Sequence, residues 1–189
     1  MPDKVQSSPA KPARSSPLRL HIGGWETKPG WTIMDVLPKP GVVDILGNCL
    51  DLSQFADSSV EEIYASHVYE HLDYVAELPK ALAEAFRVLK RGGLFRAGVP
   101  DLEVLCKMMI EPRVDVQDHF EVMRMIYGGQ STSADYHKVG FTFQILKQYL
   151  EMAGFTNVRR VESFGLFDDT SDFKFLGRRI SLNVVAYKP

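Results

Sequence analysis

The sequence predicts an α/β fold in which a mostly parallel sheet carries helices on both faces and ends in an antiparallel strand. Short apolar runs closed by turn residues indicate buried strands in the first third of the chain. Apolar residues then recur at helical spacing, and strands and helices alternate from that point. Strands separated by helices, or by loops long enough to cross over, are typical of parallel sheets covered on both faces.

Four strands are expected in the first third of the chain. Each combines apolar, β-branched or aromatic residues with a turn signal at one end. The runs are LRLHI (18–22) before Gly23-Gly24, WTIMDV (31–36) after Pro29-Gly30, VVDIL (42–46) before Gly47, and VEEIYAS (60–66) up to Ser66.

The segment 74–91 is expected to be a helix that stops at Gly92-Gly93, because glycine adopts the left-handed conformation in which many helices end. Its apolar residues fall at helical spacing: Leu78, Leu82, Ala85, Phe86 and Leu89. A fifth strand, LFRAGVP (94–100), then ends at Pro100.

The second half of the chain is expected to be helical over 102–127, with an interruption at Pro112. A polar loop follows at 128–141. Thr142 is a suitable amino-terminal cap for a helix over 143–153. Two closing strands are expected at 157–164 and 180–187, and the last can pair antiparallel with its predecessor.

Composition predicts one globular domain over 18–189, after a disordered tail over 1–17 that is rich in Pro, Ser, Lys and Ala. A formal net charge of -2 offers no basic surface for nucleic acid. No apolar run approaches the length of a membrane span. A small molecule is therefore the expected partner, and the oligomeric state stays open.

The only cysteines, Cys49 and Cys106, lie far apart in the sequence, so neither a disulfide framework nor a thiolate metal site is indicated. We expect both to be buried, reduced thiols in a soluble, cytoplasmic protein.

The residues His67, Glu70 and His71 spell HxxEH, a motif that carries zinc in one group of hydrolases. That chemistry needs a helix around both histidines, whereas His67 directly follows a predicted strand. We therefore expect the motif to span a strand end and a turn, and we expect no metal. A zinc hydrolase remains an alternative.

The carboxyl ends of the predicted strands carry small, acidic, amide and imidazole residues. In open parallel sheets, ligands bind beyond these ends. A carboxylate there can accept from both ribose hydroxyls, an amide can meet an adenine amine, and glycine allows close backbone approach. The residues concerned are Gly23, Gly24, Asp35, Asn48, Ser66, His67 and Asp101, the last of which is expected mainly to cap the next helix.

Residues 18–101 resemble the cofactor half of class I S-adenosylmethionine-dependent methyltransferases, in particular small predicted members with a shortened first loop. The segments that carry the resemblance are LHIGGW, PGWTIMDV, DILGNCLDLSQFADSSVEEIYASHVYEHL and ALAEAFRVLKRGGLFRAGVPDLE. MIYGGQ, DYHKVGFT and LEMAGFTNV extend it to about residue 165. The resemblance implies a Rossmann-like fold and S-adenosylmethionine as cofactor.

The resemblance also implies roles for single positions. Gly23 and Gly24 match the glycine loop under the methionine part of the cofactor, and Asp35 matches the residue that binds the ribose. Asn48 and Cys49 match the pair that faces adenine. Ser66 and His67 match the strand end where the transferable methyl group meets the substrate.

Two features depart from the family pattern. Only the eight residues 23–30 separate the first two strands, which leaves no room for the usual crossover helix. Asn48 also stands where aspartate is common, so its contact with adenine lacks charge assistance. We therefore expect either a low cofactor affinity or a site that the loop 128–141 completes.

Sequence and resemblance together predict methyl transfer to a small-molecule acceptor, with a sugar or glycan precursor suggested by the resemblance alone. His67 and His137 are the candidate catalytic bases, because histidine titrates near neutral pH. The alternative is a catalytically degenerate methyltransferase fold that serves as a binding module.

Overall fold

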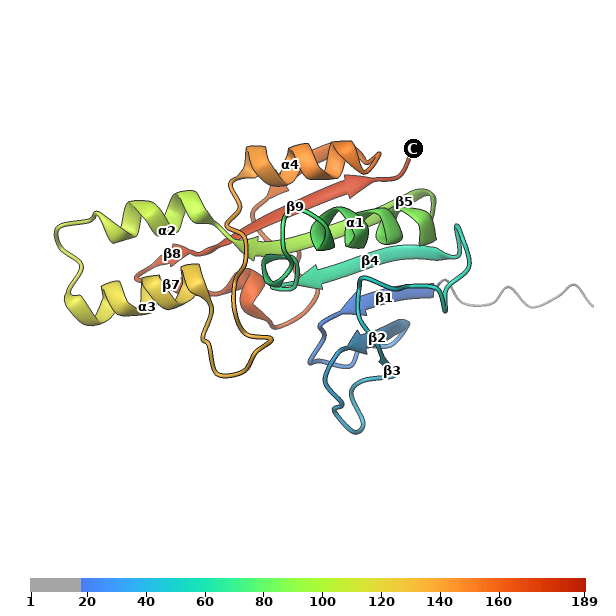
Figure 1. Cartoon of the computed structure of the whole chain (residues 1–189), viewed down its shortest axis with the longest axis horizontal. Helices are drawn as coiled ribbons and strands as arrows, with labels where there is room; N and C mark the ends of the chain where they lie inside the picture. The colour runs from blue at the N-terminus through green and yellow to red at the C-terminus, as the bar shows by residue number, and fades with distance from the viewer. Residues whose placement is uncertain (1–17) are drawn as a thin grey trace, which may run out of the picture.

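The computed structural model describes residues 18–189, and the predicted tail 1–17 lies outside the described residues. It contains a seven-stranded sheet in the order β3-β2-β1-β4-β5-β9-β6 (Figure 1). The strands from β3 to β5 are parallel, and β9 runs antiparallel to both β5 and β6. The predicted mostly parallel sheet with an antiparallel final strand is therefore confirmed. Its strands are β1 (Leu18–Ile22), β2 (Trp31–Asp35), β3 (Ile45–Leu46), β4 (Val60–Ser66), β5 (Leu89–Pro100), β6 (Thr156–Val161) and β9 (Ser181–Tyr187).

The described part of the chain has four α-helices, and the interruption expected near Pro112 is present between the second and third. They are α1 (Glu77–Val88), α2 (Leu102–Met109), α3 (Val116–Tyr127) and α4 (Phe143–Met152). Two short 3-10 helices, η1 (Tyr69–His71) and η2 (Thr170–Asp172), and a ribbon of β7 (Lys174–Phe175) and β8 (Arg178–Arg179) complete the chain. None of the helices within residues 18–189 has the length and apolar character that a membrane crossing requires.

The expected stop of the first helix at Gly92-Gly93 is wrong. Helix α1 ends at Val88, and Leu89 is already extended because it pairs with Val60 of β4. The register shifts before pairing resumes at Leu94, so the glycines lie in an irregular stretch inside β5. Pairing with a neighbouring strand, which sequence periodicity does not reveal, ended the helix early.

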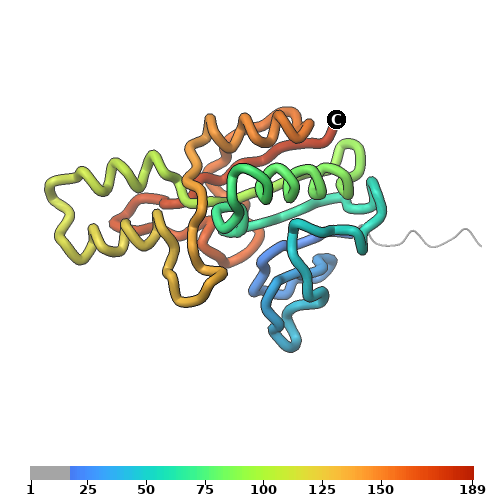
Figure 2. The backbone as a smooth tube through the Cα atoms, viewed as in Figure 1, coloured from blue at the N-terminus to red at the C-terminus, as the bar shows by residue number. Residues whose placement is uncertain are grey.

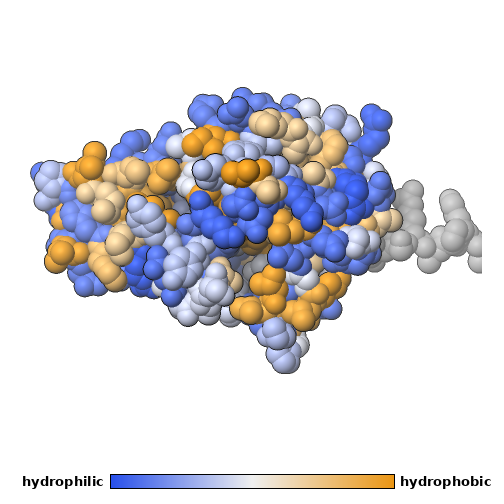
Figure 3. Space-filling view, viewed as in Figure 1, coloured by the Kyte–Doolittle hydropathy of each residue, from blue (hydrophilic) through white to orange (hydrophobic). Residues whose placement is uncertain are grey.

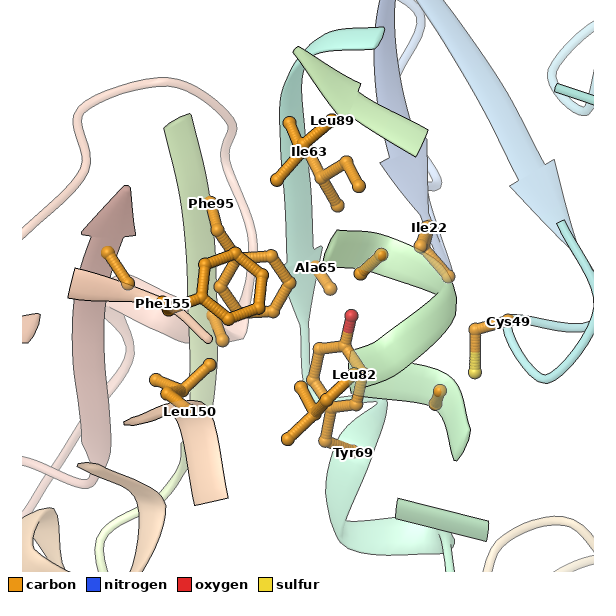
Figure 4. Close-up of a cluster of buried hydrophobic side chains, with 14 of the residues drawn as sticks. Ile22, Cys49, Ile63, Ala65, Tyr69, Leu82, Leu89, Phe95, Leu150 and Phe155 are labelled. Atoms are coloured by element: carbon orange, nitrogen blue, oxygen red, sulfur yellow. The ribbon is translucent and has the colours of Figure 1, made fainter. Parts of the chain in front are cut away.

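The apolar core lies on one face of the sheet, under α1 and α4. Alternate strand residues point to this face, as the period of a strand requires. They pack against buried side chains of both helices, and Figure 4 shows the centre of this cluster. Its largest members include Leu20, Ile63, Tyr69, Leu78, Leu82, Phe95, Leu150 and Phe155. Cys49 is buried here as expected, but Cys106 is exposed on α2.

The opposite face of the sheet is covered by the connection between β6 and β9. Phe167 from this connection packs on His21 and Tyr64, with ring centroids 4.1 Å and 4.9 Å apart. The Tyr64 hydroxyl donates to Asp169 over 2.7 Å. In the described part of the chain, helices α1 and α4 cover the face of the sheet that carries the apolar core. The segment that covers the opposite face contains the short helix η2.

The helices α2 and α3 extend beyond the sheet as an arm beside β7 and β8 (Figure 1). The arm has a small core of its own, made by Leu105, Met108, Val122 and Ile180. Figure 2 shows the loop after α3 turning back toward the carboxyl ends of the parallel strands. The backbone N–H of Lys138 in this loop donates to the carbonyl of Glu70 in η1 over 2.7 Å. This bond fixes the loop beside the end of β4.

Candidate functional site

A cleft of about 620 Å³ opens at the carboxyl ends of the strands β1, β2, β3 and β4. The loop residues 131–136 and Lys138 form its other wall. This is the edge at which ligands bind in open α/β sheets, and the volume suits a ligand of nucleoside size. Part of the loop 128–141, one of the two alternatives for this site, borders the cleft.

Five of the residues predicted from the sequence line this cleft: Gly23, Asp35, Asn48, Cys49 and His67. The structure locates three others elsewhere. Gly24 packs against the ring of His21, where a Cβ atom would lie only 2.7 Å from Nδ1. The Ser66 hydroxyl donates to Asp169 over 3.2 Å and borders a second cavity. His137 lies behind the cleft wall, with Nδ1 3.1 Å from the carbonyl oxygen of Met125.

Gly23 follows β1 with φ of +74°, a conformation that glycine adopts without strain. A Cβ atom here would lie 2.6 Å from the Cγ2 atom of Val68. The N–H of Gly23 donates to the carbonyl of Met34 over 2.8 Å, which joins the ends of β1 and β2. Glycine is therefore required both by the positive φ of the turn and by the close approach of the Val68 side chain.

Asp35 ends β2, and its carboxylate already has two partners. Oδ1 accepts from the N–H of Leu37 over 2.8 Å, and Oδ2 lies 3.6 Å from the ammonium of Lys39. Burial lowers the pKa of Lys39, although Asp35 opposes this effect. The ammonium also lies over the ring of Trp25. Sequence reasoning missed Lys39, whose only signal is its position four residues after the acid.

Asn48 and Cys49 follow β3 in a tight turn. The Asn48 side-chain oxygen accepts from the N–H of Leu50 over 3.0 Å, and its amide hydrogens remain as donors. Burial raises the pKa of the Cys49 thiol to about 11, so this group stays protonated and unreactive at neutral pH.

Apolar side chains surround the mouth of the cleft. Val36 and Leu37 are each 50% exposed, and Trp25 is 72% exposed. Figure 3 shows apolar surface gathered over the β2 and β3 region, next to the polar loop that forms the other wall. Apolar groups beside a few polar ones are typical of a small-molecule site.

His67 lies at the end of β4 with φ of +56°, a strained conformation for a residue other than glycine. Its Nδ1 is 3.1 Å from the Glu70 carboxylate and its Nε2 is 2.8 Å from the Ser181 hydroxyl. That hydroxyl donates to the carbonyl of Thr170 over 2.8 Å, so it accepts from His67. His67 therefore has a hydrogen bond at Nε2 and only an ion-pair contact at Nδ1.

Glu70 is fully buried in η1 and faces three histidines. Burial alone would raise the pKa of its carboxyl, but charge on His67, aided by His71 and His137, outweighs burial and holds this pKa below its usual range. Burial lowers the pKa of His137 despite the nearby Glu70. The HxxEH motif spans the end of β4 and the short helix η1, as expected.

A second cavity of about 140 Å³ adjoins the cleft, and both are bordered by Gly23, Trp25 and His67. Its other lining residues are mostly polar: His21, Glu26, Ser66, Phe167, Asp168, Asp169 and Thr170. Glu26 accepts from the N–H of Asp168 over 2.8 Å, which ties the loop before β2 to the loop before β9. His67 is the imidazole at the junction of the two cavities.

Residues 34–97, from Met34 in β2 to Ala97 in β5, match the family model described as a methyltransferase domain. No curated protein matches the sequence significantly.

Solved structures share the fold at low sequence identity. A SAM-dependent methyltransferase from Archaeoglobus fulgidus is 16% identical, with a TM-score of 0.57 over 91% of this chain and 86% of that chain. The 1,6-didemethyltoxoflavin-N1-methyltransferase of Burkholderia thailandensis, solved with S-adenosylhomocysteine, is 16% identical, with a TM-score of 0.56 over 90% and 70%. A possible exported protein from Bordetella parapertussis is 12% identical, with a TM-score of 0.53 over 90% of this chain, which spans only 61% of that structure. Residues 34–97 are therefore similar to a methyltransferase domain, and the chain shares the fold of solved S-adenosylmethionine-dependent methyltransferases.

Proposed function

We propose that this protein transfers a methyl group from S-adenosylmethionine to a small polar acceptor. One observation carries the proposal. Gly23, Asp35 and Asn48 come from the ends of three neighbouring strands and border one cleft of nucleoside size, at the sheet edge where this fold binds ligands.

The residues present fit an adenosyl cofactor. Gly23 gives the close backbone approach that the methionine part needs, and the Asp35 carboxylate can accept from ribose hydroxyls beside Lys39. Asn48 offers amide donors to adenine, while Val36 and Leu37 offer apolar contact. The bound sulfonium supplies the reactivity, so this chain contributes binding, exclusion of water and alignment.

The acceptor is proposed to bind in the second cavity, which adjoins the cleft at His67. The carboxylates of Glu26, Asp168 and Asp169 border this cavity and accept hydrogen bonds. Such a lining suits an acceptor with several hydroxyl groups or an amine, and a sugar or glycan precursor belongs to this class.

His67 is proposed to face the reacting atoms because it borders both cavities. A base is needed only if the acceptor loses a proton during transfer. His67 would act in that way as the tautomer with its hydrogen on Nδ1, beside Glu70, which leaves the Nε2 lone pair free once the contact with Ser181 opens. His137 borders neither cavity and is the weaker candidate. The free thiols of Cys49 and Cys106 fit a cytoplasmic location, which we propose on that ground.

Calorimetry with S-adenosylhomocysteine tests the cofactor site. Asp35→Ala should lose charge-assisted hydrogen bonds worth about 1.5–3 kcal/mol, roughly ten- to a hundredfold in affinity. Asp57→Ala removes a surface carboxylate far from the cleft and should bind normally. Unchanged affinity in a folded Asp35→Ala variant would show that the ribose lies elsewhere.

A catalytically degenerate binding module is the second candidate, favoured by two observations. The segment 23–30 contains no helix that could point its amino-terminal end at the cofactor carboxylate, and Lys39 already pairs with Asp35. Incubation with methyl-labelled S-adenosylmethionine and a panel of hydroxylated and amine acceptors distinguishes the two. Transfer of label to any acceptor excludes the binding module.

A further inference from the structure

Beside the cleft, Glu70, His71 and His137 each offer one ligand atom, and these three atoms lie within 4.8 Å of one another. We propose that Glu70, His71 and His137 bind a divalent metal ion of the zinc class at the edge of the cleft. The site differs from the one suggested by HxxEH, because His137 from the loop replaces His67. It does not depend on the proposed methyl transfer.

The carboxylate of Glu70 is the first reason. Glu70 has no exposed surface, and neither of its side-chain oxygens makes a hydrogen bond within residues 18–189. His67 Nδ1 lies at ion-pair distance, 3.1 Å from Oε1, without hydrogen-bond geometry. A buried carboxylate normally costs several kcal/mol unless it is paired and fully hydrogen-bonded or coordinates a metal. A bound cation would give these oxygens the coordination that the contact with His67 alone does not supply.

The two histidines are the second reason, because each is held by its other ring nitrogen. Nδ1 of His71 lies 3.1 Å from the carbonyl oxygen of Tyr136, and Nδ1 of His137 lies 3.1 Å from that of Met125. A carbonyl can only accept, so Nδ1 carries the hydrogen in both rings and Nε2 keeps its lone pair. A metal-binding histidine typically has this type of second contact, which fixes its tautomer and orientation.

The chain brings the three side chains together from two segments. Glu70 and His71 belong to η1, and the backbone bond from Lys138 to Glu70 holds the loop that carries His137 against η1. The two imidazole rings meet edge to face, with centroids 4.9 Å apart. Ligand atoms around a tetrahedral zinc lie roughly 3.4 Å apart. The loop would therefore need to close by about 1 Å on the metal.

Two imidazoles and one carboxylate match the ligand set of open zinc sites, in which a fourth position is left for water or a ligand oxygen. His71 borders the cleft, so this position is near the space proposed for the bound ligands. The borderline ligand set favours zinc over magnesium or calcium, which prefer oxygen ligands alone.

The test is a titration of the full chain, free of any histidine tag and treated with a chelator, with Zn²⁺ in a calorimeter. Co²⁺ binding, followed by visible absorption, reports on imidazole coordination. Wild type should bind one Zn²⁺ per chain. His71→Ala and His137→Ala should each weaken binding at least a hundredfold. His119→Ala removes a histidine of α3 outside the cluster and should bind like wild type.

Glu70→Gln should also weaken binding, but a variant of this buried residue can lose its fold. The two histidine variants, checked by circular dichroism, therefore decide the matter. Absence of saturable one-to-one binding by wild type would overturn the proposal. So would binding that persists in both histidine variants or that falls equally in His119→Ala. None of these measurements requires S-adenosylmethionine, so failure here leaves the proposed methyl transfer untouched.

Discussion

Substitution of His21 is expected to change how stability depends on pH. His21 lies in β1, one residue before its end, on the face covered by Phe167, and only 2% of it is exposed. Burial lowers its pKa from 6.5 to about 4, although Asp169, Glu26 and Asp35 oppose the effect. Its Nδ1 makes no hydrogen bond within residues 18–189. The folded chain therefore keeps this ring neutral where the unfolded chain would protonate it.

The direction and size of the effect follow from these two pKa values. As the pH falls through 6.5, the unfolded state takes up a proton that the folded state takes up only near pH 4. The free energy of unfolding therefore falls between these values and levels off below them. The full difference corresponds to roughly 3 kcal/mol, of which about 2 kcal/mol appears between pH 7 and pH 5.

Urea unfolding of wild type and His21→Leu at pH 7 and pH 5 measures this term. Leucine fills a similar volume and cannot protonate, so the fall in unfolding free energy should be about 2 kcal/mol smaller in the variant. Carboxylates with lowered pKa, such as Glu77 and Glu84, titrate in both proteins and cancel in the comparison. Equal pH dependence in the two proteins would refute the idea that the connection before β9 seals this face of the sheet.

Three further substitutions test the fold by urea unfolding. Gly23→Ala should lower the free energy of unfolding more than Gly30→Ala does. Both glycines have positive φ, which costs an alanine roughly 1–2 kcal/mol, but only the new Cβ at position 23 would collide with Val68. Equal costs would mean that the close approach at Gly23 is unimportant. Leu82→Ala should lower the free energy of unfolding by about 2–5 kcal/mol because this side chain of α1 is fully buried in the core, and no change would argue against that packing. Asp101→Ala should cost about 1–3 kcal/mol through the lost cap of α2, and no cost would show that the cap does not support the helix.

Local sequence signals predicted most of the fold. Apolar runs located the strands of the first half, and Thr142 and Asp101 were expected to cap helices that they do cap. The spacing of apolar residues located α1 but predicted its end too late. The helix ends where Leu89 pairs with Val60, which is a contact between segments that lie far apart in the sequence. Such contacts leave no trace in local spacing.

The sequence likewise predicted some features of the candidate site and not others. The chain order alone indicated that Gly23, Asp35 and Asn48 would meet, because the carboxyl ends of parallel strands share one edge of the sheet. It did not indicate that Lys39 would occupy one side of Asp35, or that Ser66 would turn to Asp169 instead of the cleft. Both depend on how loops return to the sheet.

The sequence by itself determined which residues end the strands, since strand period and turn chemistry act over a few neighbouring positions. Only the tertiary structure decided which of those residues have free polar groups. The cluster of Glu70, His71 and His137 forms because a loop far along the chain folds back onto η1. In the same way, Phe167 covers His21 of β1 although it lies in a connection more than a hundred residues later in the chain. Burial and pairing of charges are properties of the assembled fold, and they determine what each side chain can bind.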